Sequence, residues 1–479
     1  MEEKEWRKLG FINEKIMKLT LTILTFVIFI WVAATSAMQG KILGVVLLAL
    51  ILWSLYPQYH FFSSIFIILL LSLFGISFNL NEFINALFLT YGRSGLWIII
   101  SGFILSEGME ASGLARRIAL KIVTSLGGDP AKIILAVALA NLAVAPLSPS
   151  TTAKAFLLLP ICMGLVKAFG VEKGKSNYGA GVMIMAMAAN NICSTGFLTA
   201  TVPNPISASY IEDAAGISLS WFEWLRMALP LTLILLIFSW LVCKWMFKPE
   251  VKKSSEALKN IWDMEKRMGV ISRKEILVAL LFSISLTLWI TEKIHGLNSG
   301  LLSLALSLLL FLPGIEVIRV RGFAGEVPWG SITLFAASML LAKSVSYWKA
   351  LDPVAYSIFE SLSLHRLPPL LFLILVIIVC MFIHVIFTST TVYATVMIPL
   401  SISLAKLQML PVQMIAIPVA FLTPIALILP VNTIPNLVFY SSGYFTQKQM
   451  ITYGLIVSLM SAFLIILIGL PYWLSIGLI

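Results

Sequence analysis

Two stretches of the chain carry the same run of three hydroxyl residues. Residues 150–160 begin with Ser-Thr-Thr and end on proline, and residues 389–399 do the same at the same spacing. Hydroxyls at a helix start cap its first N–H groups, and those N–H groups with the helix dipole favour an anion. Hydroxyls and the carbonyl ends of half-helices can equally hold Na⁺. The predicted ion-binding residues of the two triplets are Ser150, Thr151, Thr152, Ser389, Thr390 and Thr391.

Each triplet is followed along the chain by a second signature, Thr-x-Pro-Asn. It occurs at 201–204 and again at 433–436, so the two signatures lie about as far apart as the two triplets, nearly half the chain. Paired motifs at nearly one separation indicate a duplicated chain. This signature adds further residues to the predicted substrate site, namely Thr201, Pro203, Asn204, Thr433, Pro435 and Asn436.

One lysine and one histidine lie near the triplets within apolar sequence. Lys154 follows Ser150 by four residues, and His384 precedes Ser389 by five. An ionisable group deep in a membrane is costly unless it faces a cavity or a partner, so both join the predicted site. Lys154 could offset substrate charge or take the place of a cation, or its side chain could instead reach the membrane surface. The alternative for His384 is a hydrogen-bonded packing role.

The elements that position these residues must lie in a membrane. Hydrophobic residues make up 59% of the chain and charged residues 11%, with a mean hydropathy of +0.99, whereas about a quarter of a soluble domain is charged. Many apolar runs approach the ~20 residues that a helix needs to span a membrane. Hydrophobic residues do not alternate with polar ones at every second position, which argues against an outer-membrane β-barrel. The net charge is +11, and most of the basic residues lie in loops between the apolar runs, where they set the orientation of the spans. Because this explains the positive charge, no nucleic-acid partner is expected.

The apolar runs divide the chain into two repeats. The first covers 1–247 and the second 275–479, joined by a basic linker at 248–274 that we expect in the cytoplasm. The basic lead at 1–17 places the N-terminus in the cytoplasm as well. About eleven crossings then leave the C-terminus outside, and an odd number of them between the motif regions makes the second repeat inverted.

Each triplet interrupts an apolar run in its middle. Because proline breaks a spanning helix, we predict re-entrant hairpins at about 132–166 and about 369–407. The arms of the first, about 15 residues each, are short for full crossings. Broken helices are predicted at about 178–205 and about 412–438. Irregular backbone at this depth must be buried or line a cavity, which again indicates a site.

Other features are predicted to serve the fold. The four cysteines lie in apolar runs and are expected to be small buried side chains, with no metal site. The segment 211–225 is expected at the membrane interface, anchored by Trp221 and Trp224. The sequence contains no nucleotide loop, HExxH motif or nucleophile elbow, so we do not expect an enzyme.

The motifs resemble those of the divalent anion/sodium symporter family, which carries citrate, succinate, malate, 2-oxoglutarate and sulfate. Residues 145–154, Ala-Pro-Leu-Ser-Pro-Ser-Thr-Thr-Ala-Lys, are similar to the Ala-Pro-x-x-Pro-Ser-Asn-Thr-Ala-Arg pattern of its dicarboxylate-exchanger branch. Residues 113–119, 429–436 and 443–445 and the placement of His384 are similar as well. The resemblance covers most of the chain from about residue 90 onward.

The family's motif asparagine, which contacts substrate and, in the symporters, sodium, is replaced here by Thr151 and Thr390. If sodium binds, the resemblance implies that Ser150, Thr151, Gly196 and Thr390 hold it. It also implies a scaffold part, an elevator-like transport part that carries both hairpins, and a homodimer.

We therefore predict an all-α polytopic carrier of the inner membrane, with an inverted repeat, that exchanges small dicarboxylates such as malate, succinate and 2-oxoglutarate. One alternative is a sodium-coupled symporter of di- or tricarboxylates or sulfate. An alternative of another class is an ion channel or cation/proton antiporter. A proton antiporter would want a buried carboxylate, and the predicted hairpin and broken-helix cores contain none. No cofactor is expected besides Na⁺ as a coupling ion.

Overall fold

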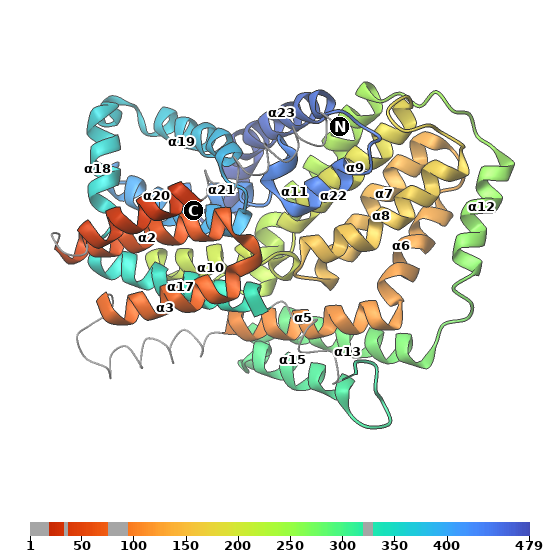
Figure 1. Ribbon diagram of the computed structural model, residues 1–479, viewed down its shortest axis with the longest axis horizontal. Helices are drawn as coiled ribbons and strands as arrows, with labels where there is room; N and C mark the ends of the chain where they lie inside the picture. Colours follow the sequence, from red (N-terminus) through yellow and green to blue (C-terminus); the bar gives the residue numbers. More distant parts are fainter. Residues whose placement is uncertain (1–18, 33–36, 75–93, 320–328) are drawn as a thin grey trace.

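The computed structural model describes residues 19–32, 37–74, 94–319 and 329–479. The basic lead at 1–17 lies outside these residues. Within them the chain is helical and contains no strand (Figure 1). Seven of the described helices are long and apolar enough to cross a membrane, or eight if one bent pair counts as a single span. The all-helical membrane class is therefore confirmed, while the number of about eleven crossings stays a prediction.

Both triplets lie where a helix begins after an interruption. In the first half, α7 (Pro130–Val144) is followed by a 3₁₀ turn, and α8 (Thr151–Ala168) begins at the triplet. In the second, α19 (Pro369–Ile383) and a 3₁₀ turn precede α20 (Thr390–Leu407). With its turn, the α7 arm has 18 residues, and α8 also has 18. The predicted length of about 15 residues fits α7 itself, which has 15, but it was too short for α8, which continues past 166.

Two further helices are interrupted at the Thr-x-Pro-Asn signatures. In the first half, α9 (Asn177–Thr195) gives way to a 3₁₀ turn and then α10 (Pro203–Ala215). In the second, α21 (Gln413–Leu422) is separated from α22 (Ile434–Tyr440) by an irregular stretch with one 3₁₀ turn. We call these irregular stretches the first break (196–202) and the second break (423–433). The first broken helix extends ten residues beyond the predicted end at 205.

The predicted interfacial anchors are buried. Trp221 and Trp224 open α11 (Trp221–Met246), and their side chains are almost fully enclosed. The Trp221 indole N–H donates to the Thr199 hydroxyl at 3.1 Å, and that of Trp224 donates to the Thr195 carbonyl at 3.0 Å. The prediction of interface anchors was wrong, because the end of α9 and the first break offer the acceptors that buried indoles require.

Two groups of three helices have matching internal packing. In one, α5 packs on α13 and α15, and in the other α17 packs on α2 and α3. Figure 1 shows the α17 group at the left of the view and the α5 group below and to the right of it. Their bounds are α5 (Ser94–Ser112), α13 (Arg273–Ile290), α15 (Ser299–Leu308), α17 (Trp329–Trp348), α2 (Met38–Leu55) and α3 (His60–Phe74). Each group thus combines helices from both halves of the chain.

The halves cross again around the tips, because α10 packs on α20 and α22 packs on α8. The interrupted helix of each half therefore supports the triplet of the other half. This exchange brings the two triplets, far apart in sequence, towards one region of the molecule.

The basic linker contains a helix that the sequence analysis did not predict. This helix, α12 (Ser255–Lys266), packs on α8 and on α6 (Leu114–Ser125) along one edge of the molecule (Figure 1). Ile261 is buried, and Met264 lies against Gly164 of α8, where an added Cβ would come within 2.5 Å of its methyl group. The sequence did contain a sign of this helix, since Ile261 and Met264 are two apolar residues three positions apart within a charged segment.

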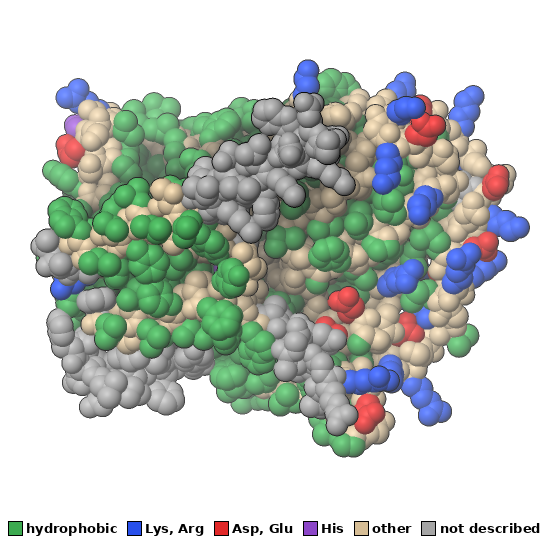
Figure 2. All heavy atoms as spheres, in the orientation of Figure 1, with side chains coloured by type: hydrophobic (Ala, Val, Ile, Leu, Met, Phe, Trp, Pro, Cys, Tyr) green, Lys and Arg blue, Asp and Glu red, His purple; other side chains and the backbone are tan. Residues whose placement is uncertain are grey.

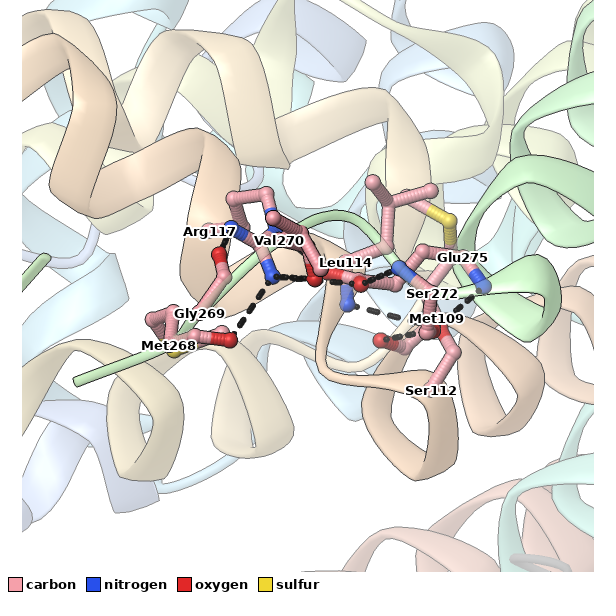
Figure 3. Close-up of polar contacts among 9 residues, drawn as sticks. All are labelled: Met109, Ser112, Leu114, Arg117, Met268, Gly269, Val270, Ser272 and Glu275. Atoms are coloured by element: carbon pink, nitrogen blue, oxygen red, sulfur yellow. Dashed lines mark hydrogen bonds and ion pairs between the residues drawn. The ribbon is translucent and has the colours of Figure 1, made fainter. Parts of the chain in front are cut away.

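A second set of contacts joins α6 to the end of the linker (Figure 3). The Arg117 guanidinium donates to both carboxylate oxygens of Glu275, at 2.5 and 3.2 Å. It also donates to three consecutive carbonyls of the linker, those of Met268, Gly269 and Val270. A planar guanidinium is suited to such a fork of acceptors. The linker is therefore held against α6 along this stretch.

Candidate functional site

A cavity of about 620 Å³ lies between the two triplets. It is lined by all six triplet residues and by the starts of the Thr-x-Pro-Asn signatures, including Thr201, Thr433 and Pro435. Serines and threonines make up nearly half of its lining, and among the described lining residues there is no aspartate, glutamate, lysine or arginine. Neutral hydroxyl and backbone donors therefore dominate the surface that an enclosed ion would meet.

The serine of each triplet is a helix cap. Ser150 Oγ accepts a hydrogen bond from the Ala153 N–H at 3.1 Å, and Ser389 Oγ accepts one from the Val392 N–H at 3.5 Å. These bonds fix the starts of α8 and α20 at the cavity wall. The positive dipole ends of both helices are thus directed at one cavity, which favours an anion there.

The two asparagines of the signatures do not line the cavity, and their amides bond to the breaks instead. Asn204 donates to the carbonyls of Ser194 and Phe197, at 2.7 and 2.8 Å. Asn436 donates to those of Ala426 and Leu429, at 2.6 and 3.1 Å. In both cases the acceptors precede the asparagine by ten and seven residues. The two side chains therefore perform the same task, closing the break in front of each half-helix.

Lys154 is buried within the protein and reaches neither the cavity nor the membrane surface. Its ammonium donates to the Ser194 hydroxyl at 2.8 Å and to the Ala200 carbonyl at 2.7 Å. The side chain thus joins α8 to the first break, beside Gly196, which also lies outside the cavity lining. The Lys154 Nζ is thus bound by a hydroxyl and a carbonyl oxygen, which are the kinds of ligand that would coordinate a hard metal cation.

His384 has a comparable place in the second half. Its Nε2 donates to the Thr423 carbonyl at 2.8 Å, at the start of the second break, and its ring stacks on Tyr393. The Asn432 amide returns from that break to the carbonyls of His384, Val385 and Phe387. The His384 imidazole is buried and does not line the cavity. Pro203 of the first signature, also predicted at the site, does not line the cavity either.

Several cavity residues were not predicted from the sequence. Asn191 lines the cavity and donates to Asn436 Oδ1 at 2.9 Å, which connects the two broken helices directly. Its neighbour Asn190 donates to the Thr151 carbonyl at 3.0 Å. Two adjacent asparagines within an apolar span are unusual, and this pattern could have identified Asn190 and Asn191 from the sequence. His60 and Ser54 come from the α2–α3 region and carry no recognisable pattern.

The described residues contain no group of three or more histidine, cysteine, aspartate or glutamate side chains that could hold a metal ion. Of the residues expected around sodium, Ser150, Thr151 and Thr390 line the cavity. They provide only hydroxyl and backbone oxygens, which suit a hard cation such as Na⁺ but give it no full countercharge.

Residues 13–479 match the model of a family described as "Sodium:sulfate symporter transmembrane region". The chain belongs to this family. Among curated relatives, the citrate/succinate antiporter of Escherichia coli (strain K12) is 27% identical over 390 residues, covering 80% of this chain and 79% of that protein. The sodium-dependent dicarboxylate transporter SdcS of Staphylococcus aureus (strain USA300) is 27% identical over 401 residues, covering 79% of this chain and 76% of that protein.

Solved structures of similar fold are transporters as well. The YdaH transporter of Alcanivorax borkumensis gives a TM-score of 0.56 at 14% identity, covering 88% of this chain and 99% of that one. MtrF of Neisseria gonorrhoeae, an antimetabolite efflux pump, gives 0.55 at 11% identity, covering 86% and 94%. The chain is thus a multi-pass membrane protein with a transporter fold, and the resemblance seen in the sequence is confirmed.

Proposed function

We propose that this protein exchanges small dicarboxylates, such as succinate, malate and 2-oxoglutarate, across the inner membrane. The observation that carries the proposal is the cavity closed on two sides by the capped starts of α8 and α20. Two carboxylates on a short carbon chain match two helix starts that each favour one negative charge. The names of the relatives, a citrate/succinate antiporter and a dicarboxylate transporter, favour the same class of substrate.

The proposed mechanism is alternating access by an inverted repeat, with the two triplets as tips of re-entrant hairpins. The matching packing groups and the identical bonds of Asn204 and Asn436 support a duplicated architecture. In this arrangement α7–α8 and α19–α20 belong to a moving part, and the α5 and α17 groups to a scaffold. A homodimer, an N-terminus in the cytoplasm and a C-terminus outside complete the proposal.

We favour exchange without sodium because of Lys154. Its ammonium already provides a positive charge at the first break, bound to Ser194 and Ala200. A second cation placed close by would be repelled strongly in a medium of low dielectric constant. Unlike a bound sodium ion, the Lys154 side chain cannot leave the site together with the substrate. Return of the empty site is then unfavourable, which is the behaviour of an obligate exchanger.

Counterflow in proteoliposomes tests the proposal. Internal succinate should accelerate the uptake of labelled succinate strongly, and replacement of Na⁺ by K⁺ or choline should change the rate little. Uptake into empty vesicles driven by a sodium gradient alone would instead establish the sodium symporter. Failure of every dicarboxylate, with uptake of sulfate, would reject the substrate class while leaving transport intact.

Lys154→Met tests the proposed role of the lysine. Loss of the charge should abolish or uncouple exchange, and transport that then becomes dependent on Na⁺ would show that the ammonium stands for a cation. Lys343→Met, in α17, is the matched control, because Lys343 is another lysine within an apolar helix and is absent from the cavity lining. Unchanged exchange in both variants would contradict the role assigned to Lys154.

A further inference from the structure

A second, strongly basic cavity lies at the end of α11, away from the triplets. Its volume is about 610 Å³, and its wall is formed by the last turn of α11, the start of α7 and the first linker residues. Four lysines line it, Lys244, Lys248, Lys252 and Lys253. Figure 2 shows that lysine and arginine side chains gather on the side of the molecule where the linker and α12 lie, while the side with α2 and α3 is mostly hydrophobic.

The nearby acids are engaged elsewhere. Asp129, which lines the cavity, accepts from the N–H groups of Ala131 and Lys132, at 2.9 and 3.1 Å, as the cap of α7. Glu250 accepts from the Ser176 hydroxyl and from the Tyr178 N–H. Throughout the described ranges none of the four lysines forms an ion pair, and the Lys244 ammonium lies over the Trp240 ring. The cavity therefore keeps a positive field.

An apolar stripe leads along α11 to this cavity. Leu233, Ile237, Leu241 and Trp245 follow one another at intervals of four residues, and all are exposed. Residues spaced by four lie on one face of a helix, so this face of a spanning helix meets the lipid. Trp245 is 76% exposed in the last turn, where indole rings mark the boundary between hydrocarbon and headgroups.

We propose that this cavity binds the headgroup of an acidic phospholipid. The phosphate lies among Lys248, Lys252 and Lys253, and the acyl chains follow the exposed stripe of α11. Basic residues beside spanning helices attract acidic headgroups, and ammonium–phosphate hydrogen bonds are among the stronger ones in proteins. The inference requires only that α11 spans the bilayer, and it is independent of which substrate the carrier moves.

Lipid binding to the purified full-length protein, followed by native mass spectrometry, tests this site. Phosphatidylglycerol should bind in preference to phosphatidylcholine. The triple variant Lys248→Gln/Lys252→Gln/Lys253→Gln should lower the affinity for phosphatidylglycerol about a hundredfold, at roughly fivefold for each lysine. The control, Lys259→Gln/Lys266→Gln/Arg267→Gln, removes the same charge from the same linker outside the cavity and should change the affinity little.

Equal loss in both triple variants would overturn the proposal, since it would mean general attraction by the basic linker. An unchanged affinity in the first variant would overturn it too. If inorganic phosphate displaces the lipid fully and both lipids bind equally, the cavity takes a free oxyanion and not a headgroup. Trp245→Ala provides a second measurement, because it should weaken binding while leaving the lysines in place.

Discussion

The residues of each Ser-Thr-Thr triplet have separate tasks. The serines cap α8 and α20 through the Ala153 and Val392 N–H groups. The threonines are left to line the cavity between the two helix starts. A threonine hydroxyl is shorter than the amide of the family's asparagine, so these positions provide donors for an anion without an amide oxygen for a cation.

Removal of a threonine hydroxyl from either tip should weaken substrate binding. Thr152→Ala and Thr391→Ala each take away a donor to a charged ligand, which costs roughly 1.5–3 kcal/mol, or about tenfold or more in affinity. Substrate affinity measured by counterflow in proteoliposomes checks the effect. Thr287→Ala is the control, because its hydroxyl bonds within α13 at an exposed position. Normal affinity in both tip variants would mean that the triplets serve only to shape the helix starts.

At the scale of elements, the irregular breaks are held by neighbours on several sides. The amides of Asn204 and Asn436 close them from the following helix. On the second break, α23 (Gln447–Leu464) approaches so closely that a Cβ added at Gly454 would lie 2.3 Å from the Leu427 carbonyl oxygen. This position is therefore open only to glycine unless the backbone of the break moves.

Gly454→Ala should displace the second break and reduce both transport and thermal stability. The colliding atoms belong to backbone, so they cannot move aside as a flexible side chain would. Counterflow rates and the midpoint of thermal unfolding in detergent provide the measurement. Gly95→Ala in α5 is the control, since the nearest atom to its added Cβ is 3.9 Å away. If Gly454→Ala behaves like this control, the close approach of α23 to the second break is not required for transport or stability.

The contact between the linker and α9 should depend on pH through Glu250. Burial alone would raise the pKa of Glu250, but hydrogen bonds from Ser176 and from the N–H groups of Tyr178 and Asn177 outweigh it and lower the pKa below its ordinary 4.5. A lowered carboxylate pKa stabilises the fold above the ordinary value, and this contribution is lost as the pH falls through the lowered value.

Glu250→Gln should therefore lower the midpoint of thermal unfolding by a few degrees at pH 7. Below the lowered pKa the wild-type carboxyl is protonated, and the difference between the two proteins should disappear. Scans of both proteins in the same detergent across this range measure it. A difference that stays constant with pH would show that charge on Glu250 is not the source of its contribution.

At the scale of the whole molecule, the two halves of the chain exchange partners. The α5 group and the α17 group each contain helices of both halves, and α10 and α22 cross to the opposite helix pair. Such packing cannot form one half at a time, so we expect the halves to fold together. It also brings two triplets from distant parts of the sequence to one cavity.

The proposed inverted arrangement predicts the sides of the membrane on which two positions lie. In the chain with its native cysteines replaced, a cysteine at Lys259 should react with impermeant reagents only from the cytoplasm, because the linker is basic. A cysteine added at Ile479 should react only from outside. All four native cysteines are buried, so their replacement removes no exposed thiol. Labelling of both positions from one side would reject the inverted repeat.

Local features of the sequence determined the class of the protein and the positions at which its helices are interrupted. Low charge and long apolar runs require a membrane, and proline with hydroxyl residues breaks a helix wherever its neighbours lie. The two triplets could be recognised as helix starts for the same reason, since capping acts within one turn. The carrier family followed from the same motifs.

Only the tertiary structure decided which side of each helix meets the cavity. Lys154 and His384 lie one turn from the tips, yet they turn to carbonyl groups of the breaks. Asn191 and His60 reach the cavity because of how separate helices cross. Sequence spacing places a residue along its helix, whereas the partner of its side chain depends on packing between separate segments of the chain. The docking of α12 was missed for the same reason, because its apolar face is short and a charged segment resembles a solvated linker.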